Sequence, residues 1–333
     1  YGDHRDLPSF PTRRSFDLFG FVLSGPVLIP KAYNGRDKTF WMVNYEGQRE
    51  KQEVAQRAAV IPTAFREGNF SALSTPLRDP LGGTFPGNII PTSRLDPVSR
   101  NYLAIHPQPN LPGLAANLAD VEKQFNNINQ VFARGDHNFS TSDRLFARVA
   151  VFNYEFPTIE LNYFSPLQSR LTARNAVISH THLFGATSIN DLKVGFNRNW
   201  ILRSGLRTNT DFDPESMGLV GVRSVDPETR APRRLNGLET GIVPFNVTGF
   251  LTMGDGGLIP DFNVSETWQL VDNFTKTVGV HTFKAGIDFK RLRMDRAGSN
   301  NARGQFQFNG QVTGNPAADF FLGFPSLSQT PDG

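Results

Sequence analysis

Residues 173–203 read ARNAVISHTHLFGATSINDLKVGFNRNWILR, and this stretch has the pattern of a β-hairpin. In its second half Leu192, Val194 and Phe196 are apolar, whereas the residues between them are polar or small. Apolar residues at every second position indicate a strand with one apolar face. The joint at residues 185–188 is short and rich in Gly, Ser and Thr, as hairpin turns are. The stretch therefore predicts two long antiparallel strands.

The same pattern recurs along the chain and predicts about eight strands in hairpins. Strands of 11 to 15 residues are longer than the roughly 5 or 6 residues typical of globular sheets. They match the roughly 9 to 11 residues that cross a bilayer at a tilt, with some overhang. The predicted pairs are Phe19–Leu28 with Thr39–Glu53, Asn129–Phe139 with Asp143–Phe156, Ala173–Phe184 with Ile189–Arg203, and Asn263–Phe274 with His281–Arg293.

Two long segments separate these hairpins, Ala55–Ile128 and Ser204–Phe262, and both are rich in Pro, Gly, Asn and Asp. Short turns that alternate with long loops are typical of outer-membrane barrels, whose long loops face outward. We therefore expect an all-β, antiparallel transmembrane β-barrel fragment, incomplete as a barrel. The alternative is a soluble β-sandwich, which the strand length and the one-sided loops disfavour. Arg198 falls on the apolar side of its strand, which also disfavours a sandwich. In a membrane barrel it would lie beside Trp200 in the interfacial girdle, where a charge costs little.

Period two also predicts which side chains share a face of each strand. On the strand from His281 to Arg293, the apolar set that includes Ala285 should face lipid and the alternate set should face the lumen. The residues expected to face lipid are Phe283, Ile287, Phe289, Val194 and Phe196. Those expected to face the lumen are Lys284, Asp288, Lys290, Lys193 and Asn197.

Composition narrows the functional classes. The chain of 333 residues has no Cys, which excludes disulfide scaffolds, zinc ribbons, iron–sulfur centres and thiol catalysis. Its net charge of +3 comes from charges dispersed along the chain, so we expect no nucleic-acid partner. No run of 18 apolar residues predicts a transmembrane helix. We find no nucleophile or phosphate-binding motif and therefore expect no enzyme activity and no cofactor.

Two histidines, His180 and His182, are spaced i and i+2 and would point the same way from a strand. They could share a metal ion, but no nearby Cys or carboxylate in the sequence completes a ligand set. We therefore expect a solvated or girdle position and no metal site. Asp136 and His137 are adjacent on a strand, so they should face opposite sides and cannot form an acid/base pair.

Four motifs in order carry a family resemblance: GPVLIPKAYNGRDKTFWMVNYEGQRE (Gly25–Glu50), DPLGGTFPGNIIPTSRLDPVS (Asp79–Ser99), RGDHNFSTSDRLFARV (Arg134–Val149) and TGNPAADFFLGFPS (Thr313–Ser326). Together they resemble TonB-dependent outer-membrane receptors of the Oar-like type found in Acidobacteria. The resemblance implies a barrel of about 22 strands with a plug inside. We expect residues 19–333 to be the N-terminal part of that barrel, without plug, TonB box or C-terminal strands.

The first 18 residues differ in character from the rest of the chain. Asp3–Leu18 (DHRDLPSFPTRRSFDL) resembles translated sequencing adapter. We therefore expect residues 1–18 to be a non-native or disordered leader that contributes nothing to the sheet.

Two functional hypotheses from different classes remain open at this point. The first is a fragment of a TonB-dependent receptor for uptake of a large ligand, namely a siderophore, cobalamin, a glycan or a peptide. Its partners would be outer-membrane lipid, the imported ligand and the TonB complex, the last through the plug. The second is an outer-membrane surface binding or adhesion protein without transport. A soluble secreted glycan-binding sandwich is a third.

Overall fold

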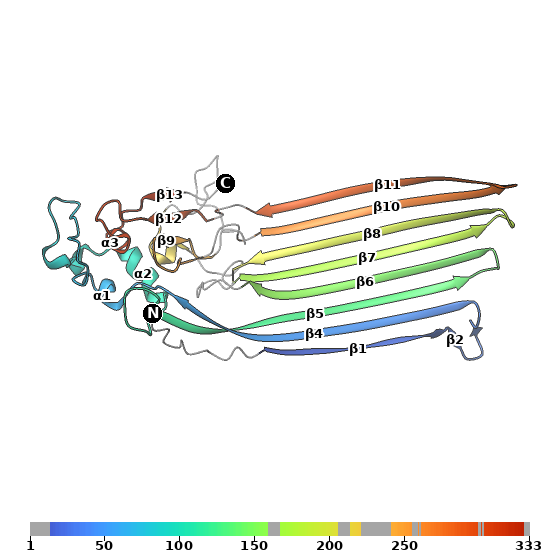
Figure 1. The fold of residues 1–333 in the computed structure, drawn as a ribbon, viewed down its shortest axis with the longest axis horizontal. Coiled ribbons are helices and arrows are strands. Elements are labelled where there is room, and N and C mark those ends of the chain that lie inside the picture. The colour runs from blue at the N-terminus through green and yellow to red at the C-terminus, as the bar shows by residue number, and fades with distance from the viewer. Residues whose placement is uncertain are drawn as a thin grey trace, which may run out of the picture.

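A computed structural model describes residues 14–158, 167–205, 214–220, 241–254, 259, 261–298, 301 and 303–329. Its main feature is one sheet of eight long strands in the order β1-β4-β5-β6-β7-β8-β10-β11 (Figure 1). Each strand pairs antiparallel with its neighbours, and the order follows the chain. The prediction of an all-β antiparallel fold is confirmed.

The strands are as long as a tilted membrane crossing requires, and several are longer than predicted. β4 and β5 extend past the predicted ends because they continue to pair with each other up to Ala58 and Leu118, inside the stretch expected to be loop. The eight strands are β1 (Arg14–Pro26), β4 (Thr39–Ala58), β5 (Leu118–Asn138), β6 (Asp143–Thr158), β7 (Leu167–Leu183), β8 (Ser188–Ser204), β10 (Asp261–Val278) and β11 (His281–Gly298).

Residues Arg14 to Leu18 correct the expectation that residues 1–18 contribute nothing to the sheet. They form the start of β1 and pair with Gln52 to Gln48 of β4. The physical reason is the backbone pairing of β1 with β4, which continues without a break to Arg14, and Arg14 Nε adds an ion pair of 2.7 Å with Glu50. Residues 1–13 lie outside the described part, and the origin of the stretch stays a prediction.

The strands are joined at one end by short connections. Residues 139–142, 184–187 and 279–280 form three of them, and the connection from β1 to β4 holds a small hairpin of β2 (Leu28–Ile29) and β3 (Tyr33–Asn34). Gly185 and Gly279 have positive φ angles, a conformation that glycine adopts at no steric cost. The predicted alternation of short turns with long loops is thus confirmed.

At the opposite end the long connections fold together into a lobe (Figure 1). This lobe was not predicted, because the sequence suggested irregular loops. Its elements are α1 (Thr63–Arg66), η1 (Pro86–Asn88), η2 (Thr92–Arg94), α2 (Pro97–Ile105), η3 (Pro214–Met217), β9 (Phe245–Val247), β12 (Gln305–Phe308), α3 (Pro316–Phe321) and β13 (Leu327–Gln329). β9, β12 and β13 form a second, three-stranded sheet.

The lobe has the main hydrophobic core of the described chain, assembled from three segments far apart in sequence. Phe65 stacks on Phe70 with ring centroids 4.2 Å apart, and Phe70 meets Phe321 edge-on. Tyr102 packs against Phe245 at 4.1 Å. Burial of these rings removes apolar surface from water and holds the segments together.

Local sequence signals start the helices of the lobe. The side chain of Asn315 caps α3 by accepting hydrogen bonds from the amides of Ala317 and Ala318, and Pro316 takes the first helical position. Both residues are local signals that indicate a helix start from the sequence alone. α2 begins in the same way, with Asp96 accepting from the amide of Ser99.

β1 and β11 are the two outer strands of the large sheet, and they do not pair with each other. In the described residues the sheet is therefore an open arc. No helix in the described part of the chain is long and apolar enough to cross a membrane.

Candidate membrane-facing surface

The register of the large sheet sorts its side chains into two faces, because directly paired residues of antiparallel strands point the same way. One face, here named the apolar face, carries an apolar side chain at most positions along the middle of every strand. Its central residues are Phe19, Phe21 and Leu23 of β1, Trp41 and Val43 of β4, Val131 and Ala133 of β5, Ala147 and Val149 of β6, Ala176 and Ile178 of β7, Leu192, Val194 and Phe196 of β8, Trp268 and Leu270 of β10, and Phe283, Ile287 and Phe289 of β11.

The residues predicted to share a face do so. Phe283, Ile287, Phe289, Val194 and Phe196 all lie on the apolar face. Lys284, Asp288, Lys290, Lys193 and Asn197 all lie on the opposite face, here named the polar face. That the first face meets lipid and the second the lumen stays a prediction.

Exposure supports the prediction that the apolar face needs a nonaqueous partner. The side chains of Ile287, Phe289 and Ile178 are 69%, 63% and 54% exposed. Because the apolar side chains adjoin one another across all eight strands, they form one continuous surface. Contiguous apolar surfaces of this extent mark membrane or protein contacts.

The apolar band is staggered across the sheet as the tilted strands of a barrel require. On β1 the apolar band centres on Phe21. Stepping from each residue to the one directly paired with it on the next strand leads from Phe21 across the sheet to Arg293 on β11. On β11 the band centres between Ala285 and Ile287, roughly seven residues from Arg293 after seven steps between strands. The band thus shifts by about one residue from each strand to the next. With a rise of about 3.3 Å per residue and a spacing of about 4.8 Å between strands, this shift corresponds to a strand tilt of roughly 35°.

Charged side chains of the polar face satisfy one another. Arg134 binds Asp136 through two hydrogen bonds of 2.7 and 2.6 Å and lies 4.3 Å from the centre of the Phe146 ring. The Asp288 carboxylate accepts from Gln269 at 2.9 Å and pairs with Lys290 at 3.2 Å. A face lined by such pairs suits a hydrated lumen.

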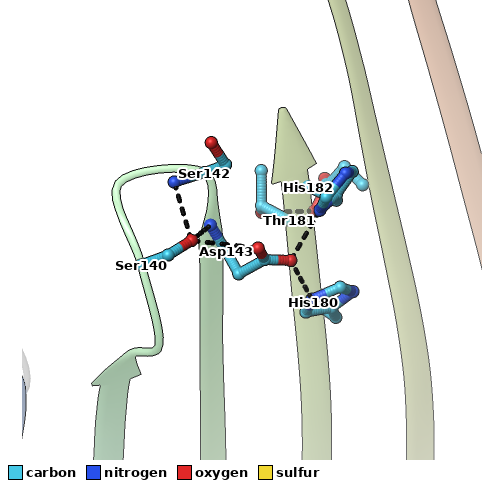
Figure 2. Close-up of polar contacts among 7 residues, drawn as sticks. Ser140, Ser142, Asp143, His180, Thr181 and His182 are labelled. Carbon is cyan, nitrogen blue, oxygen red and sulfur yellow. Dashed lines mark hydrogen bonds and ion pairs between the residues drawn. The ribbon is translucent and has the colours of Figure 1, made fainter. Parts of the chain in front are cut away.

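A polar cluster lies on the apolar face near the short turns (Figure 2). Asp143 Oδ1 is 2.5 Å from His182 Nδ1 and 3.4 Å from His180 Nε2. The other carboxylate oxygen accepts from the hydroxyl of Ser140 at 3.0 Å, and the same hydroxyl accepts from the amides of Ser142 and Asp143. The cluster therefore ties the β5–β6 turn to β7.

The two histidines do point the same way, as predicted. Their ring centroids are 6.3 Å apart and both contact Asp143, a residue that the sequence did not connect with them. The sequence did not reveal this contact because it depends on the register between β6 and β7, which places Asp143 opposite His182. Among the described residues no group of three or more His, Asp or Glu side chains has the placement to hold a metal ion.

Asp136 and His137 face opposite sides, which confirms that they cannot act as a pair. Asp136 binds Arg134 on the polar face, whereas His137 Nδ1 lies 2.6 Å from the hydroxyl of Thr39 on the apolar face. The His137 ring also packs edge-on against Phe139 at 4.3 Å. Together with Phe184, which packs on His182 at 4.2 Å, these contacts form an aromatic and polar girdle at the short-turn end.

At the loop end the apolar face changes to basic and aromatic residues. Arg198 lies on this face next to Trp200, as predicted, and directly opposite Arg174 on β7. Thr172, Arg174, Arg198 and Trp200 line a depression of about 290 Å³. The pairing of the two arginines was not predicted, because it depends on the register of β7 with β8.

Beyond the strands, the lobe places the half-buried guanidinium of Arg66 beside the buried imidazole of His106. The Arg66 guanidinium donates to the carbonyl oxygens of Ile61 at 2.9 Å and Leu103 at 3.2 Å, and burial lowers its pKa to about 10. Burial and then the nearby charge of Arg66 lower the pKa of His106 to about 4. His106 is therefore neutral at pH 7, which allows it to sit beside the guanidinium.

A second charged contact stabilises the lobe closer to its surface. Arg94 binds Asp79 in a bidentate fashion at 2.6 and 2.9 Å and lies 4.8 Å from the centre of the Phe85 ring. The hydrogen bonds from Arg94 hold the pKa of Asp79 below its usual value. Both residues belong to the motif Asp79–Ser99 that carries part of the family resemblance.

Comparison with known proteins agrees with this geometry. A family model described as "Outer membrane beta barrel domain" matches residues 9–333. Neither the comparison with curated proteins nor that with solved structures finds a match. Since the family match covers nearly the whole chain, the protein resides in the bacterial outer membrane, and the chain belongs to the outer membrane beta barrel domain family.

Proposed function

We propose that this chain forms barrel wall and extracellular surface of a TonB-dependent, Oar-like receptor that takes up a ligand too large for porins. The ligand would be a siderophore, cobalamin, a glycan or a peptide. Its uptake would draw energy from the TonB complex through a plug, and the chain itself would catalyse no bond chemistry and bind no nucleic acid.

The observation that carries the proposal is the open eight-stranded arc with a charged face. Because β1 and β11 do not pair, these strands fit a barrel that further strands complete. Barrels of about 22 strands enclose a plugged lumen. Ion pairs such as Arg134–Asp136 and Asp288–Lys290 would contact water or the plug there. The four motifs that resemble Oar-like receptors support the same assignment.

The lobe supports a role in ligand capture. Its core joins the β4–β5 connection, the β8–β10 connection and the segment after β11, so these segments form one folded surface. A folded surface presents fixed side chains and loses less conformational entropy on binding than separate loops would. In the proposed orientation this surface faces outside the cell, where a large ligand arrives first.

An uptake assay tests the proposal. The intact gene that includes these strands is expressed in a bacterial host with and without TonB, and radiolabelled ferric siderophore, cobalamin, oligosaccharide and peptide are each offered. We expect one class to bind cells of both kinds and to accumulate only in those with TonB. Binding without accumulation in either host would contradict uptake and favour the surface binding or adhesion function.

A further inference from the structure

Arg174 and Arg198 stand directly opposite each other on the apolar face at its loop end. Both are exposed, and within the described ranges neither forms an ion pair with a carboxylate. Glu266 lies opposite Arg198 on the next strand, but its carboxylate accepts from the indole of Trp268 at 3.2 Å. Among the described residues, neither guanidinium group thus forms an ion pair, Glu266 included.

Their surroundings make the absence of a partner costly. Like charges directly opposite each other on a sheet repel. The next row toward the short turns holds Ala176 and Phe196, so the arginines border the apolar band. At such a border the effective dielectric constant is lower than in water, and repulsion between the charges grows. An anion bound between the two side chains would remove this repulsion.

The depression at this point offers donors suited to a phosphate group. It is lined by the two arginines, the hydroxyl of Thr172 and the indole of Trp200. Guanidinium groups bind phosphate oxygens bidentately, and hydroxyl and indole groups add single hydrogen bonds. None of the described residues that line the depression is a carboxylate, and two of the four are cationic, which favours an anion there.

The apolar side of the depression indicates what kind of molecule carries the phosphate. Ile178, Ala176 and Phe196 continue from the arginines into the middle of the apolar face. A molecule held here would place its charged group between the arginines and apolar chains along these residues. We propose that Arg174, Arg198, Thr172 and Trp200 bind the phosphate headgroup of a lipid in the leaflet on the loop side. This inference goes beyond ligand uptake and does not depend on it.

The test uses the intact receptor in detergent and native mass spectrometry, with phosphatidic acid as the phosphate lipid and phosphatidylcholine as the comparison. We expect the protein to retain phosphatidic acid in preference to phosphatidylcholine. The double variant R174Q/R198Q should weaken this binding by roughly 10- to 100-fold, because two charge-assisted contacts are lost. R203Q is the matched control, because Arg203 lies on the same strand at the loop end of the polar face, and it should bind as the wild type does.

Three results would overturn the proposal: unchanged binding in the double variant, equal weakening in R203Q, or equal retention of both lipids. A competition experiment distinguishes a lipid phosphate from free phosphate as the ligand. If inorganic phosphate at the same concentration as the lipid displaces the lipid, the site binds free phosphate. If R174Q/R198Q does not fold, R174K/R198K preserves the charge but loses the forked donors. It should bind severalfold more weakly, and wild-type affinity would contradict recognition by guanidinium.

Discussion

Neighbouring residues on β11 should respond in opposite ways to the same substitution. Ile287 lies on the apolar face and Asp288 on the polar face. In the intact receptor, Ile287→Arg near mid-membrane should cost about 2–4 kcal/mol, because it places a charge in hydrocarbon. Asp288→Arg should leave folding nearly unchanged, because water reaches the lumen. Refolding titrations into lipid vesicles measure both values, and a larger cost at Asp288 would mean that the facing is reversed.

His106 should make the lobe sensitive to acid. Its pKa in the folded protein is about 4, below the ordinary value of 6.5, so the unfolded chain takes up the proton first. Its contribution to stability is therefore complete above pH 6.5, is lost as the pH falls toward 4, and changes no further below that. The total loss is at most about 3 kcal/mol.

Calorimetric unfolding of the lobe between pH 4 and 8 tests this, with His106→Gln compared against the exposed His281→Gln. The His106 variant should unfold with a weaker dependence on pH across this window, and the His281 variant should behave as the wild type. The same pH dependence in all three proteins would exclude His106 as the source.

The face on which each side chain lies could be predicted because it depends only on the alternation of apolar and polar residues along a strand. This alternation is visible in the sequence from Leu192 to Phe196. Contacts between strands could not. The pairing of Arg174 with Arg198, and of Asp143 with both histidines, depends on register, and the sequence contains no local signal for register in these hairpins.

Among the elements, α3 and the loop before it depend on one buried carboxylate. Asp319 is fully buried and accepts from the Thr313 amide at 2.7 Å, the Thr313 hydroxyl at 2.6 Å and the Val312 amide at 3.2 Å. Asp319→Ala removes the side-chain acceptor of the buried Thr313 amide and of the Val312 amide and should destabilise the lobe by about 2–5 kcal/mol. Loss of the helix cap in Asn315→Ala should cost only about 1 kcal/mol. Thermal unfolding of the two variants compares them, and an Asp319 cost below that of Asn315 would refute the argument.

The same elements explain what sequence could predict. α3 can be predicted from Asn315, Pro316 and Gly323, which are local signals for the start and end of a helix. α2 begins with the equivalent pair Asp96 and Pro97, a signal that was present and missed. The lobe as a whole could not be predicted, because its core joins residues as distant as Phe65 and Phe320, and no single segment shows a period of 2 or 3.6.

At the scale of the whole molecule, the eight strands should not close by themselves. Among the described strands β1 and β11 each present an unpaired edge, whereas a closed barrel leaves no edge in lipid. Expressed alone, this chain should give an open, curved sheet or aggregate and should show no conductance in planar bilayers. A conducting, heat-modifiable monomer would mean instead that β1 and β11 pair in the membrane.

We expect the apolar face of the large sheet to meet lipid and the polar face to meet water. Because the chain has no Cys, single cysteines introduced at each position from Leu192 to Asn197 give unique labels along β8. In the refolded receptor, nitroxide lipids should quench a fluorophore at Leu192, Val194 and Phe196, and a water-soluble quencher should act at the alternate positions. Quenching without a period of two, or with the opposite phase, would contradict the membrane-facing surface described above.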